Sequence, residues 1–158
     1  MDKAMTTVFM IIASVVCAIL VFNSLYPAVI RSSDAMTSMT IRVDDRLKSQ
    51  IAIIHATGDA DADKAYVWVK NVGSLRIAAV ERCDVFFGPE GDFERIPHDD
   101  ETSGTPYWTD DVENDDEWRP TATLKITITS TSALSSGTYF VKVSIPNGVS
   151  DEDYFEVN

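Results

Sequence analysis

Two groups of carboxylates are the residues best placed to carry metal chemistry in this sequence. The first group, at residues 59–63, reads Asp-Ala-Asp-Ala-Asp and has the D-x-D-x-D spacing that opens a calcium loop. However, Lys64 stands where such a loop needs glycine, and Lys70 stands where it needs a bidentate glutamate. We therefore expect residues 59–63 to form a solvated linker between a helix and a sandwich domain.

The second group is an acidic segment, residues 99–117, which contains nine acidic residues and neither Lys nor Arg. Its members are Asp99, Asp100, Glu101, Asp110, Asp111, Glu113, Asp115, Asp116 and Glu117. Carboxylate oxygens bind Ca²⁺ and Mg²⁺, and the candidates for such a site are Asp110, Asp111, Asp115 and Asp116. The alternative, which we favour, is a solvated outer loop without a metal.

The remaining reactive side chains form no catalytic pattern. His55 and His98 have no ligand spacing to a cysteine or to each other, so each is predicted to be an ordinary surface histidine. Cys17 and Cys83 are expected to be small packed side chains rather than a disulfide. The sequence has neither a G-x-S-x-G motif nor a phosphate-binding loop. We therefore predict no enzyme, no cofactor and no small-molecule substrate.

The charge of the chain restricts its partners. The formal net charge is −12, from 25 acidic and 13 basic residues. Nucleic acids and anionic lipid headgroups both select for Lys and Arg, so neither is an expected partner.

The element that dominates the N-terminal part is an uncharged run of 27 residues, Ala4 to Ile30. A helix needs about 20 apolar residues to cross a bilayer, whereas the apolar core of a secretory signal has about 7–15 and precedes a small-residue cleavage site. The run is too long for a signal and no such site follows it. It predicts a helix that spans a membrane or packs against copies of itself.

A helical stripe with a charged back follows this run. Apolar or uncharged residues recur at three- and four-residue steps, at Met36, Met39, Val43, Leu47, Gln50, Ile51 and Ile54. The helix is therefore expected to continue until Thr57-Gly58, which gives an N-terminal helical region over residues 1–57. Pro27 should kink or locally melt it near residues 23–27.

Residues 58–158 change to a period of two, which is typical of strands. We predict strands over residues 65–71, 75–80, 83–88, 121–130, 137–145 and 153–157, separated by turns. The side chains expected to face inward are Leu124, Ile126, Ile128, Tyr139, Val141, Val143 and Ile145, while Val67 and Val69 share one face. The segments around Trp108 and Trp118 should add edge strands or packed loops. The fold class is thus α+β, a long apolar helix followed by an antiparallel Ig-like β-sandwich head.

The order of these features resembles the archaellin (archaeal flagellin) family, the type IV pilin-like subunits of the archaeal swimming filament. The uncharged helix continues directly into an amphipathic half. The strand and turn at residues 67–74 read VWVKNVGS, with the V-x-V-x-N-x-G pattern of the family, and the last two strands read GTYFVKVSIPNG and DYFEV. These features together span nearly the whole chain.

The resemblance implies a structural subunit of an extracellular helical filament that serves swimming motility. The subunits would be inserted in the membrane before assembly, and an ATPase with platform proteins would build them into a homopolymer. The residues expected to form its core are Val8, Phe9, Ile11, Ile12, Val15, Val16, Ile19, Leu20, Phe22, Leu25, Tyr26 and Val29. Open filaments of this kind arise from heterologous contacts that do not close into a ring.

Two alternatives share the same architecture. The chain could be a pilin-like accessory or stator subunit, anchored singly in the membrane, or a subunit of an adhesion pilus. Two departures from the family pattern bear on this choice. Met5 stands where pilins commonly carry an acidic residue, and no basic leader ending in glycine precedes the helix. The chain is expected either to be mature already or to reach the membrane without that cleavage.

Overall fold

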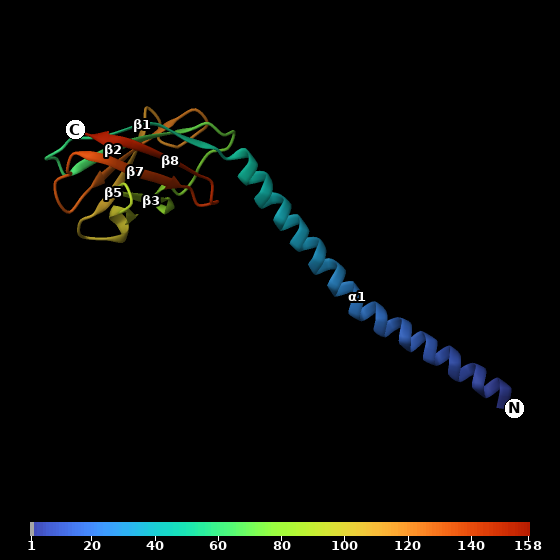
Figure 1. The fold of residues 1–158 in the computed structure, drawn as a ribbon. Coiled ribbons are helices and arrows are strands. Elements are labelled where there is room, and N and C mark those ends of the chain that lie inside the picture. Colours follow the sequence, from blue (N-terminus) through green and yellow to red (C-terminus); the bar gives the residue numbers. More distant parts are fainter. Residues whose placement is uncertain (1) are drawn as a thin grey trace. The chain divides into compact units, whose positions relative to one another are not determined.

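The computed structural model describes residues 2–158, so Met1, the first residue of the predicted helical region, lies outside the described residues. The chain divides into two compact units, one that ends at Val43 and one that runs from Asp44 to Asn158. The first unit is helical, and the second, which we call the head, contains the strands (Figure 1).

Helix α1 (Asp2–Lys48) has 47 residues. Its ends suit the helix dipole, because Asp2 lies in the first turn while Arg46 and Lys48 lie in the last. The Lys48 ammonium also pairs with the Asp44 carboxylate one turn earlier, at 2.7 Å. Hydrogen bonding to Asp44 raises the pKa of Lys48 above its usual value, which keeps a positive charge at the C-terminal end.

The prediction that this helix continues to Thr57-Gly58 is wrong. The helix ends at Lys48, and the next residues form strand β1 (Ile51–Gly58). β1 pairs antiparallel with β2 (Lys64–Asn71), which places Ile51 opposite Asn71. The β-branched isoleucines of this segment favour a strand, and the ladder to β2 supplies the backbone hydrogen bonds. Ile51 is 5% exposed and joins the core of the head.

Pro27 lies inside α1, and the residues on both sides of it are helical. Proline has no N–H, so the carbonyl of Asn23, one turn earlier, lacks its usual intrahelical donor. The chain does not melt over residues 23–27. The axis of α1 changes direction near the middle of the helix (Figure 1).

The head is a sandwich of two antiparallel four-stranded sheets with the strand orders β1-β2-β6-β5 and β4-β3-β7-β8. The remaining strands are β3 (Asp84–Pro89), β4 (Glu94–Ile96), β5 (Tyr107–Glu113), β6 (Thr123–Thr129), β7 (Gly137–Ser144) and β8 (Ser150–Val157). The predicted fold class, a long N-terminal helix followed by an antiparallel β-sandwich, is confirmed.

Side chains that alternate along the strands fill the space between the two sheets. The residues predicted to face inward are all buried, namely Leu124, Ile126, Ile128, Tyr139, Val141, Val143 and Ile145. Val67 and Val69 of β2 are also fully buried on one shared face. Trp108 on the edge strand β5 and Trp118 on a packed loop are the largest fully buried side chains.

The strand predicted over residues 75–80 is wrong. In this segment Ile77 forms an isolated antiparallel bridge to Trp118, and Val80–Arg82 form the 3₁₀ turn η1. Ala79 adopts a left-handed conformation with φ of 54°, which turns the backbone out of an extended path. Alternating apolar residues were therefore an insufficient sign of a strand here.

Candidate functional site

The apolar half of α1 offers a large unburied surface. The predicted polymerisation residues Val8, Phe9, Ile11, Ile12, Val15, Val16, Ile19, Leu20, Phe22, Leu25, Tyr26 and Val29 are between 50% and 69% exposed. No residue of Asp2–Lys48 is buried. Monomeric soluble proteins rarely expose a contiguous apolar surface of this extent. The helix therefore needs a lipid or protein environment.

The threonine and serine hydroxyls inside the apolar run bond to the helix backbone. The hydroxyls of Thr6 and Thr7 donate to the carbonyls of Asp2 and Lys3, each over 2.8 Å. Ser14 and Ser24 donate in the same way to carbonyls three residues earlier, over 2.8 and 3.0 Å. Such bonds remove the cost of placing a hydroxyl in hydrocarbon, where water is absent.

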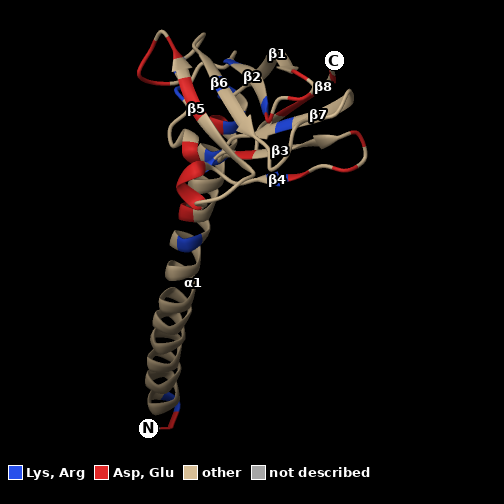
Figure 2. Cartoon of the chain, turned by 90° about the vertical axis from the view of Figure 1, so that its left-hand side faces the viewer, with Lys and Arg blue, Asp and Glu red and all other residues tan. Residues whose placement is uncertain are grey.

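Charge and length make α1 suitable for crossing a membrane. Among residues 2–158, it is the helix that is long and apolar enough to do so. The 27 uncharged residues span about 40 Å at 1.5 Å per residue, whereas the hydrocarbon core is about 30 Å thick. Figure 2 shows that Lys, Arg, Asp and Glu are absent from most of the length of α1.

The V-x-V-x-N-x-G motif fastens the start of β1 to the turn after β2. The Asn71 side chain is fully buried, and its amide nitrogen donates to the carbonyls of Leu75 and Trp118 over 2.8 and 3.2 Å. Its amide oxygen accepts the Gly73 N–H over 3.0 Å. Asn71 therefore ties the turn at residues 73–75 to the loop that carries Trp118, in addition to the backbone bonds that Gly73 and Trp118 make.

Gly73 makes the closest backbone approach at this junction. A Cβ atom there would lie 2.5 Å from the Lys48 carbonyl oxygen and 2.6 Å from the Gln50 nitrogen. Backbone hydrogen bonds hold the two segments together at this point. The N–H of Ser74 donates to the Lys48 carbonyl over 2.8 Å, and the N–H of Gly73 donates to the Gln50 carbonyl over 2.9 Å. The last carbonyl of α1 is thus capped by the turn after β2.

The four carboxylates predicted as weak metal candidates are not brought together. Asp110 and Asp111 are neighbours on β5, so their side chains lie on opposite faces. Asp110 accepts from His98, whereas Asp111 lies opposite Lys125 of β6. In the turn after β5, Asp115 accepts the backbone N–H of Asp116 over 2.8 Å, which leaves one carboxylate occupied with the turn itself.

The predicted calcium-like segment at residues 59–63 is the turn between β1 and β2. Its three aspartates are exposed, and Asp61 has a left-handed φ of 68°. The N–H of Ala62 donates to the Asp59 carbonyl over 3.2 Å. The segment is thus a solvated connection as expected, but it joins two strands rather than a helix and a sandwich.

His98 is not the surface histidine that was predicted. Its side chain is 6% exposed and packs edge-on against the Trp108 ring, with 4.5 Å between the ring centroids. Its Nε2 lies 2.8 Å from Asp110 Oδ1, and its Nδ1 accepts the Asp100 N–H over 3.3 Å. His55 is exposed and lies over Trp68, with a centroid separation of 5.2 Å.

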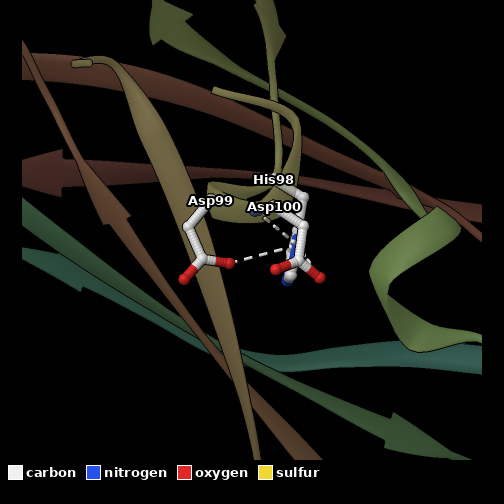
Figure 3. A group of neighbouring side chains, drawn as sticks. All are labelled: His98, Asp99 and Asp100. Carbon is white, nitrogen blue, oxygen red and sulfur yellow. Dashed lines mark hydrogen bonds and ion pairs between the residues drawn. The ribbon is translucent and has the colours of Figure 1, made fainter. Parts of the chain in front are cut away.

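Within the described residues, His98, Asp99 and Asp100 form the group whose ligand atoms could reach one metal ion (Figure 3). The Nδ1 atom lies 3.1 Å from Asp99 Oδ1 and 3.6 Å from Asp100 Oδ2. A neutral imidazole has one lone pair in the ring plane. Because that lone pair already accepts the Asp100 N–H, an ion would have to displace a backbone hydrogen bond.

Two further titratable groups have structural rather than chemical roles. Arg95 joins β4 to the neighbouring elements through Asp84, at 2.6 Å, and Glu101, at 3.0 Å. The hydrogen bond from Arg95 lowers the pKa of Glu101.

Burial, with a smaller effect from Asp110, raises the pKa of the Cys83 thiol to about 12. Cys83 is therefore an inert thiol rather than a nucleophile.

Comparison with known proteins gives this architecture a family. The family model for archaeal-type flagellin matches residues 3–155, which include both α1 and the head. An uncharacterised protein of Archaeoglobus fulgidus is 28% identical over 159 residues, covering 97% of each chain.

Two solved structures from Sulfolobus acidocaldarius are similar to this chain. The archaellum periplasmic stator protein FlaG has a TM-score of 0.59 and 28% identity, and the match covers 68% of this chain and 99% of that one. The periplasmic stator complex of FlaF and FlaG gives the same score and identity, over 67% of this chain and 88% of that one. The family match over nearly the whole length confirms the resemblance, and the chain belongs to the archaeal-type flagellin family.

Proposed function

We propose that this protein is a stator-type subunit of the archaellum, held in the membrane by α1 and carrying its head outside the cytoplasm. The observation that supports this proposal most is the similarity to FlaG, whose chain is covered over 99% of its length. The part of this chain that matches, 68%, is close to the share that the head of residues 44–158 represents.

The helix supplies the anchor that a stator needs. A stator subunit must resist a force applied to its head, so its attachment has to persist. The apolar run is longer than the hydrocarbon core requires, and the hydroxyls of Thr6, Thr7, Ser14 and Ser24 bond to the helix backbone. A membrane-spanning helix gives effectively irreversible insertion, unlike a single lipid chain.

A filament subunit remains the second candidate, because the family match includes α1 as well as the head. In that function α1 exchanges lipid for other copies of α1, and the heads cover the outside. Lipid tails are as apolar as leucine, so the exchange gains little from the hydrophobic effect and depends on helix packing. The two functions therefore differ in where the helix resides after assembly, rather than in what the helix is made of.

The relatives also support a partner for the head. The FlaG of the second structure is part of a complex with FlaF. We propose that the head of this protein binds another archaellum protein, while assembly ATPase and platform proteins remain expectations carried by the family resemblance alone.

Shearing cells that bear archaella separates the two functions. The expected result is that the protein stays with the membranes at low copy number, and that sheared fibres contain a different major subunit. Quantitative mass spectrometry of both fractions makes the measurement. If the protein is instead the dominant component of the sheared fibres, the stator proposal is wrong and the filament function is correct.

A deletion strain adds a second measurement. Loss of a stator subunit should leave archaella on the cells but abolish or reduce swimming, because the motor then has no stationary part against which to turn the filament. Loss of a filament subunit should remove the fibres themselves. Electron microscopy and swimming assays of one strain therefore distinguish the two functions.

A further inference from the structure

The head contains a cavity of about 440 Å³ between the β3–β4 turn and the loop that joins β6 to β7. The turn contributes Gly88, Pro89, Asp92, Phe93 and Glu94, and the loop contributes residues 130–135. Cavities that bind small molecules usually measure about 300–1,000 Å³. This volume is therefore sufficient for a small ligand.

The wall formed by the β3–β4 turn is held in place. The N–H of Glu90 donates to the Thr138 carbonyl on β7 over 3.0 Å, and the N–H of Asp92 donates to the Pro89 carbonyl over 2.9 Å. A Cβ atom on Gly88 would lie 2.4 Å from the Asp92 carbonyl oxygen, so glycine allows the turn to close tightly over β3.

The opposite wall is tied to the β1–β2 turn. The N–H of Ser130 donates to the Asp63 carbonyl over 2.8 Å, and that of Leu134 donates to the Ala62 carbonyl over 2.7 Å. Ser135 donates its N–H to the Tyr139 hydroxyl over 3.2 Å. Both walls are thus formed before any ligand arrives, which reduces the entropy cost of binding.

Aromatic rings line part of the cavity. Phe87 and Tyr139 are buried and stack with 5.4 Å between their centroids. Phe93 is 49% exposed, and its ring packs against that of Phe140 with 4.5 Å between the centroids. The faces of such rings are electron-rich and attract the partly positive hydrogens of C–H groups.

The polar lining has a distinctive composition. Asp92 and Glu94 supply carboxylates, and hydroxyls come from Ser130, Thr131, Ser132 and Ser135. No Lys or Arg lines the cavity among the residues that the structure describes. A carboxylate accepts hydrogen bonds, whereas a hydroxyl both donates and accepts. The lining therefore suits a ligand that is itself rich in hydroxyls and carries no negative charge.

We propose that this cavity binds a neutral sugar residue. Sugar hydroxyls would donate to Asp92 and Glu94 and exchange hydrogen bonds with the serine-rich loop, while an apolar C–H face of the ring lies on Phe93. An arginine side chain of another protein could use the two carboxylates and the ring, but it would leave the hydroxyls of the loop unused. The inference is independent of whether the chain is a stator or a filament subunit.

Saturation-transfer NMR on the full chain tests this inference. The protein is held in micelles of octaethylene glycol monododecyl ether, a detergent with neither a sugar nor a charge. The probes are the methyl glycosides of glucose, galactose and mannose, with methyl glucuronide and arginine ethyl ester as charged comparisons. We expect transfer to at least one neutral glycoside, strongest at the C–H groups of one ring face, and weaker transfer to the glucuronide.

Matched variants assign the signal to the cavity. Asp92→Asn and Glu94→Gln keep the shape but remove a charged acceptor, and each should weaken binding roughly 10- to 100-fold. Phe93→Ala should weaken it about 2- to 12-fold through the lost stacking. Glu90→Gln removes the same charge from the same turn outside the lining and should leave binding unchanged.

The inference is overturned if no neutral glycoside receives saturation, or if the Asp92 and Glu94 variants bind as well as the Glu90 variant. Transfer to arginine ethyl ester alone would also overturn it, and would assign the cavity to a cationic side chain of another protein.

Discussion

The Nε2 atom of His98 lies 2.8 Å from the Oδ1 atom of Asp110 and joins the connection after β4 to the edge strand β5. Because Nδ1 accepts the Asp100 N–H, Nε2 is the nitrogen that carries the hydrogen and donates it to the carboxylate. The His98 side chain is 6% exposed and that of Asp110 is 30% exposed. The bond is thus partly shielded from water and ties the connection after β4 to the outer edge of the sheet.

Asp110→Ala should destabilise the head by about 1–3 kcal/mol, because the buried Nε2–H of His98 loses its acceptor. Asp111→Ala is the control, since its side chain lies on the other face of β5, and it should change stability by less than about 0.5 kcal/mol. Urea denaturation of both variants, followed by near-ultraviolet circular dichroism, makes the comparison. Equal stabilities for the two variants would show that the histidine bond contributes nothing.

Val16→Asp should weaken membrane insertion and impair archaellum function while the head stays folded. A charged aspartate at the centre of a membrane helix costs about 2.5–3.5 kcal/mol on insertion scales. Val16 is 50% exposed in the middle of the uncharged run, where no basic residue lies within a turn. Val16→Leu is the control. Alkaline extraction of membranes and a swimming assay give the readout, and an aspartate variant that remains in the membrane and supports normal swimming would contradict the role of α1.

Chelators should leave both the melting temperature of the head and the integrity of archaella unchanged. Asp110 and Asp111 lie on opposite faces of β5, and the Nδ1 lone pair of His98 accepts a backbone N–H. Melting curves with EDTA, and after dialysis against calcium, provide the measurement. A lower melting temperature of the head in EDTA would instead support a metal site in the acidic segment.

Cys83 should make the stability of the head fall at high pH. Burial raises its pKa to about 12 from the 9.0 expected in the unfolded chain. Above pH 9 the unfolded state loses the thiol proton while the folded state keeps it, so this contribution to stability is complete below pH 9 and is lost as the pH rises toward 12.

Comparing Cys83→Val with the parent protein, both carrying Cys17→Ser, isolates this effect from other titrations. Urea denaturation below and above pH 9 should show a steeper loss of stability in the protein that retains Cys83. Identical pH dependences would mean that the thiol is free to ionise in the folded head.

Local patterns were sufficient to predict most of this fold. The uncharged run of Ala4–Ile30 fixes one helix, and the alternation of Leu124, Ile126 and Ile128 fixes one core strand with its inward face. The prediction failed at residues 51–58, because Ile51 and Ile54 have the three-residue spacing of a helix face while Ile51 and Ile53 have the two-residue spacing of a strand face. Only the pairing of this segment with β2 decides between the two.

The environment of His98 could not be predicted in the same way. Its partners Trp108 and Asp110 are 10 and 12 residues away, and they meet it because a parallel bridge joins His98 to β5. A histidine followed by two aspartates gives no sign of burial, since acidic neighbours are typical of an exposed loop. The contact depends on the path of the chain between two strands, which periodicity does not specify.

Gly73→Ala should destabilise the head by about 1–3 kcal/mol, because the added methyl group would overlap the backbone where α1 enters the head. Its Cβ would lie 2.5 Å from the Lys48 carbonyl oxygen, which also accepts the N–H of Ser74. Gly104→Ala is the matched control, since a Cβ there has no neighbour within 4 Å. The alanine at position 73 should lower the urea midpoint and speed hydrogen exchange at the Ser74 N–H, whereas the control should change neither. If both variants behave like the parent, the Asn71–Gly73 turn does not fix the end of α1, and the glycine of the V-x-V-x-N-x-G motif needs another explanation.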